Sequence, residues 1–149
     1  MEASIKKIIL ATDFSDASKE ASNSALLLAQ THNAELKALH VFAKTKWNIP
    51  SHDYLAIDEV VAGIEEARQQ GRDTLKELAK SFGLKVETIF SEGDPGHEII
   101  RVAEELSADL IVLGTHGHMG WKRFTLGSVA ELVVRHAPCA VLTIRPKGK

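Results

Sequence analysis

The sequence has a single cysteine, few aromatic residues and no long apolar run, and these shortages exclude several classes of protein. Because Cys139 is the single cysteine, no disulfide forms within the chain, and a reducing compartment suits it. No apolar run approaches the roughly 20 residues that a membrane-spanning helix needs. The formal net charge is −2, which argues against the basic face that nucleic-acid binding requires. We therefore expect neither a membrane partner nor a nucleic-acid partner.

The first residues lack the features of a secretory signal. After Lys6 and Lys7 only four apolar residues precede Thr12, whereas a signal peptide carries an apolar segment of roughly 7–15 residues. Together with the lone cysteine, this predicts a cytoplasmic location. The length suits one domain, and the sequence contains no internal repeat or low-complexity stretch. We expect a single domain over residues 1–149.

Short apolar runs alternate with longer amphipathic segments along the whole sequence. The apolar runs predict strands at residues 5–11, 36–42, 85–90, 110–113 and 139–144. The amphipathic segments predict helices at residues 16–32, 58–82, 95–107 and 128–136, with a long loop at 43–57. This alternation is typical of an α/β fold, a doubly wound parallel sheet of five strands with helices on both faces.

Two segments that directly follow strands carry unusual chemistry. Ala11-Thr12-Asp13 ends the first strand, and the glycine-bearing segment from Gly114 to Ser128 follows the fourth. In open α/β sheets, ligands bind beyond the carboxyl ends of the strands, where the strand order reverses. Both segments are therefore candidates for one binding site.

The segment after the fourth strand predicts an anion site. Gly114 and Gly117 allow tight turns and close approach of the backbone to a ligand. Gly127-Ser128 opens the last helix, where free backbone N–H groups and the helix dipole favour phosphate. Alternatively, Ser128 simply caps the helix, a contribution of about 1 kcal/mol.

Known phosphate motifs narrow this interpretation. The sequence contains no Gly-x-x-x-x-Gly-Lys-Ser/Thr and no Gly-x-Gly-x-x-Gly after the first strand. The spacing from Gly114 is instead Gly-x2-Gly-x9-Gly-Ser, which resembles the nucleotide-binding signature of the ATP-binding branch of universal stress proteins. Thr12-Asp13-Phe14-Ser15, Leu39-His40-Val41 and Ala137-Pro138-Cys139 are similar to that family too. The likeness covers essentially the whole chain.

The resemblance implies a strand order of 3-2-1-4-5 and an adenine nucleotide (ATP, ADP or AMP) lying across the ends of strands one and four. It implies that Asp13 contacts the ribose or phosphate region and that the backbone of Val41 meets the adenine. Mg²⁺ would be held mainly through the phosphates. The full set of expected nucleotide-binding residues is Ala11, Thr12, Asp13, Val41, Leu113, Gly114, Thr115, His116, Gly117, His118, Gly127, Ser128 and Val129. Ala11 departs from the proline that members of the family often have there.

Several alternatives accompany this interpretation. His116 and His118 lack a clear third ligand, so we expect no metal held by the protein itself. A phosphoryl-receiver domain needs an aspartate at the end of the third strand, where this chain has Phe90-Ser91. An interaction module of the same fold without a nucleotide stays an alternative, and so does slow ATP hydrolysis or self-phosphorylation at Thr125 or Ser128. The last strand would lie at the sheet edge, so we expect a homodimer through it.

Overall fold

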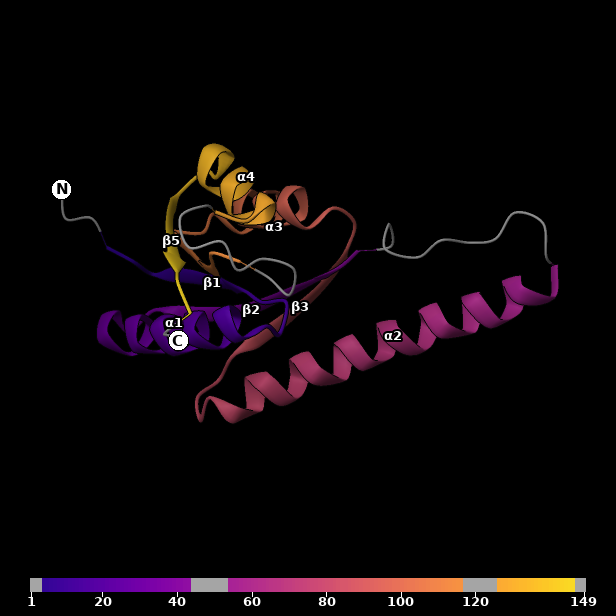
Figure 1. Cartoon of the computed structure of the whole chain (residues 1–149). Coiled ribbons are helices and arrows are strands. Elements are labelled where there is room, and N and C mark those ends of the chain that lie inside the picture. Colours follow the sequence, from indigo (N-terminus) through magenta and orange to yellow (C-terminus); the bar gives the residue numbers. More distant parts are fainter. Residues whose placement is uncertain (1–3, 44–53, 117–125, 147–149) are drawn as a thin grey trace.

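The structure is a computed structural model that describes residues 4–43, 54–116 and 126–146, and the side chains of residues 57 onward in the second range. Strands and helices alternate along the chain, as the sequence predicts (Figure 1). Their bounds are β1 Lys7–Ala11, α1 Asp16–His32, β2 Glu35–Phe42, α2 Tyr54–Ser81, β3 Glu87–Glu92, α3 Pro95–Leu106, β4 Leu110–Gly114, α4 Ser128–His136 and β5 Ala140–Ile144.

The five strands form one parallel sheet in the order β3-β2-β1-β4-β5, which confirms the predicted fold and strand order. β1 lies at the centre, where Ile9 is in register with Lys37 of β2 and Ile111 of β4. Ile8, Ile9 and Leu10 are completely buried. A central parallel strand is covered on both faces, which is why this run contains no alternating polar residues.

Helices cover both faces of the sheet. α1 and α2 lie on one face, and α3 and α4 lie on the other (Figure 1). Because neighbouring residues of a strand point to opposite faces, Ile8 and Leu10 pack with α1 whereas Ile9 packs with α3 and α4. On α1 the packing surface is a stripe of alanines that includes Ala21 and Ala25, which lets the helix axis lie close to the sheet.

Several predicted boundaries are wrong by one or two residues, and the start of α2 is wrong by four. β3 runs to Glu92 rather than residue 90, because Ser91 and Glu92 pair with Val41 and Phe42 of β2 although their side chains are polar. α2 begins at Tyr54, so the predicted loop at 43–57 is too long by its last four residues. No glycine or proline interrupts residues 54–57, and alanine and leucine there favour a helix. Residues 44–53 of that loop lie outside the described residues.

Candidate functional site

The candidate site lies at the carboxyl edge of the sheet, beyond the ends of β1 and β4. The strand order reverses between these two strands, since β2 and β3 lie on one side and β5 on the other. Such a switch point is where doubly wound sheets bind ligands. α1 begins beside it on one face of the sheet and α4 on the other.

The turn from β1 into α1 is held by its own side chains. Ser15 is the N-cap of α1, and its hydroxyl accepts a hydrogen bond from the Ser18 amide at 3.3 Å. One oxygen of Asp13, Oδ1, accepts hydrogen bonds from the Ser15 amide at 3.0 Å and from the Ser18 hydroxyl at 2.6 Å. The start of α1 therefore has side-chain acceptors for its amides within the fold.

The segment after β4 is closed by two backbone hydrogen bonds. The Thr115 amide donates to the Ile144 carbonyl at 2.9 Å, which continues the β4–β5 ladder. The Thr115 carbonyl accepts from the Gly127 amide at 2.7 Å. These bonds bring the two ends of the glycine-bearing segment together at the start of α4.

The start of α4 has no side-chain cap. Its N-cap is Gly127, which has no side chain, and within the described ranges no other side chain makes a capping hydrogen bond there. The first amides of a helix have no partner inside the helix, so those that follow Gly127 point outward with the positive end of the helix dipole. This arrangement suits a negatively charged ligand.

His116 lies next to this helix start. Its Nδ1 is 3.1 Å from the Thr115 hydroxyl, while its Nε2 is buried and finds no hydrogen-bond partner among the described residues. A Cβ on Gly127 would lie 3.6 Å from the His116 Cα, so the two residues are neighbours. A buried nitrogen without a partner is costly, and a bound ligand is one explanation for it.

The two described glycines of the signature also have structural reasons to be glycine. A Cβ on Gly114 would lie 2.7 Å from the Ala17 Cβ and 3.0 Å from its backbone carbonyl carbon. A Cβ on Gly127 would lie 2.9 Å from the Thr115 carbonyl oxygen. The glycines therefore permit α1 to pack on β4 and the segment ends to meet, and by themselves they do not establish a ligand.

The structure brings most of the expected residues together at this edge. Thr12 and Asp13 follow β1, Gly114 to His116 end β4 and follow it, and Gly127 to Val129 begin α4. The side chains of Ala11 and Leu113 are buried in the core beneath the edge. Val41 lies on β2 and is partly buried against the core. Gly117 and His118 lie outside the described residues.

Sequence reasoning missed His40 and Ser18, both of which contact the β1–α1 turn. The His40 Nδ1 lies 2.8 Å from the Thr12 carbonyl oxygen, and its ring stacks on Phe14. A histidine between the apolar residues Leu39 and Val41 was the available signal. Ser18 gave no comparable signal, since a serine in the first turn of a helix is common.

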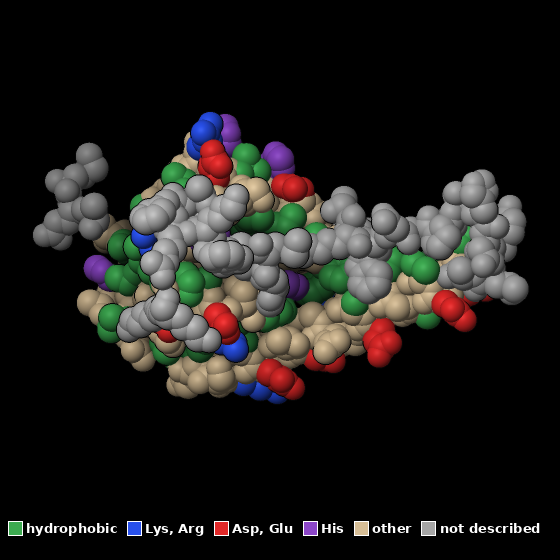
Figure 2. Space-filling view, viewed as in Figure 1, with side chains coloured by type: hydrophobic (Ala, Val, Ile, Leu, Met, Phe, Trp, Pro, Cys, Tyr) green, Lys and Arg blue, Asp and Glu red, His purple; other side chains and the backbone are tan. Residues whose placement is uncertain are grey.

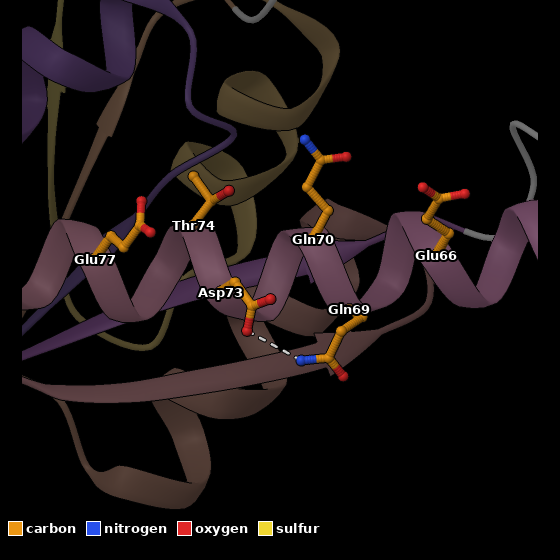
Figure 3. Close-up of a pocket in the computed structure, with 6 residues that line it drawn as sticks. All are labelled: Glu66, Gln69, Gln70, Asp73, Thr74 and Glu77. Atoms are coloured by element: carbon orange, nitrogen blue, oxygen red, sulfur yellow. Dashed lines mark hydrogen bonds between the residues drawn. The ribbon is translucent and has the colours of Figure 1, made fainter.

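A surface depression of about 640 Å³ lies elsewhere, along α2. Figure 3 shows that all six lining residues come from this one helix: Glu66, Gln69, Gln70, Asp73, Thr74 and Glu77. Acidic side chains are also spaced along α2 in the face that Figure 2 shows. Three carboxylates and no basic group line the depression, so it does not suit a phosphate.

Two further kinds of chemistry, metal binding and a reactive thiol, were considered for the described residues. Within residues 4–43, 54–116 and 126–146 there is no cluster of three side chains able to hold a metal ion. Cys139 is half-buried, and its burial, followed by the charge of Asp109, raises the pKa of its thiol. A raised pKa leaves little thiolate near neutral pH, so this cysteine is a poor nucleophile.

Comparison with known proteins agrees with this architecture. The Universal stress protein family matches residues 4–145. The chain belongs to the universal stress protein family. Universal stress protein MJ0531 of Methanocaldococcus jannaschii is 38% identical over 146 residues, which cover 97% of this chain and 84% of that protein. The family resemblance drawn from the sequence is thereby confirmed.

Solved universal stress proteins share the fold. The universal stress protein UspA from Lactobacillus plantarum matches with a TM-score of 0.75 at 33% identity, over 97% of this chain and 100% of that chain. A universal stress protein in complex with cAMP matches with a TM-score of 0.63 at 26% identity, over 97% of this chain and 99% of that chain. Nucleotide binding therefore occurs within the family. Among the described residues of this chain, no helix combines the length and apolar character needed to cross a bilayer.

Proposed function

We propose that this universal stress protein binds an adenine nucleotide such as ATP at the carboxyl edge of its sheet, as part of a stress response or signalling pathway. The observation that carries the proposal is the start of α4, which no described side chain caps, beside the buried Nε2 of His116, which has no hydrogen-bond partner among the described residues. Phosphate oxygens would accept hydrogen bonds from the first amides of α4 and satisfy the positive end of its dipole. The cAMP-bound relative supports the choice of an adenine nucleotide.

The other end of the nucleotide would lie toward β1 and β2. Asp13, which follows β1, would accept hydrogen bonds from the ribose hydroxyls, and the backbone of Val41 would meet the adenine edge. Mg²⁺ would be held mainly by phosphate oxygens and water, where it would neutralise phosphate charge. Binding that sets the shape or the partners of the protein, rather than rapid turnover, is the proposed activity.

The test is a calorimetric titration of ligand-free protein with Mg-ATP, for wild type, Gly127→Asp and Gly127→Ala. Aspartate at this position places a carboxylate at the start of α4, where it caps the amides and repels phosphate. Its Cβ also meets the Thr115 carbonyl, a contact that Gly127→Ala creates without the charge. We expect micromolar binding by wild type, loss of about 100-fold or more in Gly127→Asp, and a smaller loss in Gly127→Ala.

The outcomes separate the two leading functions. Equal affinities in all three proteins would place the ligand away from α4 and contradict the proposed site. Absence of binding by well-folded wild type would leave an interaction module of the same fold, without a nucleotide, as the better account.

We also propose that the chain forms a homodimer through β5 in the cytoplasm. β5 is an edge strand, and its apolar run Ala140 to Leu142 carries no charge that would block pairing with another chain. Sedimentation equilibrium of wild type and Val141→Lys tests this. A dimer that becomes monomeric in the variant supports the proposal, and a monomeric wild type contradicts it.

A further inference from the structure

His40 of β2 is bonded to the turn that follows β1. Its Nδ1 lies 2.8 Å from the Thr12 carbonyl oxygen. A carbonyl only accepts, so Nδ1 carries the hydrogen and donates it. The Thr12 amide in turn donates to the Leu39 carbonyl at 2.9 Å. Both polar groups of the Thr12 backbone are thus fixed to β2.

The His40 ring also contacts the residue on the other side of Asp13. It stacks on Phe14 with ring centroids 4.4 Å apart and an angle of 28° between the planes. Phe14 has a φ of 65°, in the left-handed region that a bulky side chain disfavours by about 1 kcal/mol or more. Such a conformation persists where surrounding contacts impose it. Here they are the ring stack and a hydrogen bond of 3.1 Å from the Phe14 amide to the Thr12 hydroxyl.

Packing on the far side fixes the His40 ring itself. Phe90 of β3 lies 5.8 Å away, centroid to centroid, at 44°. α2 passes close above through Gly71, where a Cβ would lie 3.6 Å from the His40 ring and 3.1 Å from that of Phe90. His40 is half-buried, and packing on Phe14, Phe90 and α2 restricts its rotamer and so maintains its contacts to the turn.

We propose that His40 is a positioning residue, which holds the β1–α1 turn so that Asp13 is presented to the ribose of the bound nucleotide. Asp13 lies between Thr12 and Phe14, the two residues that His40 fixes. The inference rests on the proposed nucleotide site. It assigns to the β1–α1 turn the selection of nucleotides over inorganic phosphates. The phosphate half is built on α4, which lies on the opposite face of the sheet from α2, the helix that the His40 ring packs against, so we expect it to work without His40.

The experiment titrates wild type and His40→Ala with three probes in the presence of Mg²⁺: ATP, dideoxy-ATP without ribose hydroxyls, and inorganic tripolyphosphate. We expect His40→Ala to bind ATP about tenfold more weakly, which corresponds to about one lost hydrogen bond. Tripolyphosphate affinity stays within about twofold of wild type, because α4 is unaffected. Dideoxy-ATP binds both proteins equally, since it makes no ribose hydrogen bond to lose.

Two further variants serve as a conservative replacement of His40 and as a control. His40→Asn retains an amide donor near the position of Nδ1 and recovers part of the ATP affinity, and it carries the same comparison if His40→Ala does not fold. His32→Ala, at an exposed histidine near the end of α1, changes none of the affinities. An equal loss for ATP and tripolyphosphate, or no loss for ATP, overturns the inference alone. Absence of ATP binding by wild type overturns the proposed function, and the inference with it.

Discussion

The starts of α1 and α4 face the same edge of the sheet from opposite faces, and they differ in how their amides are satisfied. At α1, Ser15 caps the helix, and Asp13 accepts hydrogen bonds from Ser15 and Ser18. At α4 the cap is Gly127, with no side chain to accept from the helix amides. Side chains of the fold complete the start of α1, whereas among the described residues no side chain completes the start of α4.

This difference divides the candidate site into two halves with separate tasks. The half built on the β1–α1 turn is rigid before any ligand arrives, because its hydrogen bonds and the Phe14–His40 stack are internal. The half at α4 consists of the positive end of the helix dipole and the first backbone amides, which attract anions of many kinds. Affinity for phosphate and selectivity for a nucleoside are therefore expected to respond to different substitutions.

The largest expected effect on stability comes from Gly114→Ala, where the two halves meet. The added Cβ would lie 2.7 Å from the Ala17 Cβ, in the first turn of α1. Neither partner is a flexible side chain, so α1 must move away from β4. We expect a loss of about 3 kcal/mol in the free energy of unfolding, measured by urea denaturation.

A matched glycine separates this contact from the general effect of alanine. Gly63 lies in α2 with nothing within 4 Å of a Cβ, and Gly63→Ala is expected to stabilise by about 0.5–1 kcal/mol. In the double variant Gly114→Ala/Ala17→Gly, part of the lost stability returns because the opposing methyl is gone. Equal effects of the two single alanine substitutions would show that Gly114 is not a packing requirement.

The sequence predicted the fold well because its signals are local. Short apolar runs identified all five strands, although in β3 the run is only Ile89-Phe90, and Gly127-Ser128 placed the start of α4 at the residue observed. The site was predicted less completely. Gly114 was interpreted as allowing close approach of the backbone to a ligand, and Gly127 as part of a phosphate-binding helix start. The structure shows that helix packing and loop closure also require these glycines. The contact of His40 with Thr12 joins residues 28 apart and has no local signature.

The next largest expected effect on stability comes from Ser18 at the start of α1, compared with Ser128 at the start of α4. Ser18 is buried, donates to Asp13 Oδ1 at 2.6 Å and accepts from the Asp13 amide at 3.2 Å. Ser18→Ala leaves that amide without its acceptor and should cost about 1–2 kcal/mol of stability. Ser128 is exposed, so Ser128→Ala should change stability by less than about 0.5 kcal/mol.

For tripolyphosphate affinity at α4 we expect the reverse order, with Ser128→Ala having the larger effect of the two variants. Ser128→Ala weakens tripolyphosphate binding several-fold if its hydroxyl donates to a phosphate oxygen, whereas Ser18→Ala leaves it unchanged. Thermal unfolding and calorimetric titration of both proteins supply the two readouts. If Ser128→Ala were the more destabilising variant, Ser128 would be a structural cap and α4 would not be the open helix start.

The smallest expected effect concerns α3, a second helix with a side-chain cap. Asp94 accepts hydrogen bonds from the His97 amide at 3.1 Å and from the His97 ring at 2.6 Å. The bond from the His97 amide first, and then that from its side chain, hold the pKa of Asp94 below its ordinary value of 3.8. Because the folded pKa is depressed, the stability it contributes is present above pH 3.8 and is lost as pH falls through the folded pKa.

Asp94→Asn keeps a capping oxygen but removes the charge, so its stability relative to wild type reports this carboxylate alone. The carboxylate is largely exposed, and solvent screening limits its contribution to less than about 1 kcal/mol. We expect wild type to be the more stable protein at about pH 6 and the difference to shrink toward about pH 3, measured by urea denaturation. A difference that stays constant over this range would mean that the cap of α3 depends on its oxygen and not on its charge.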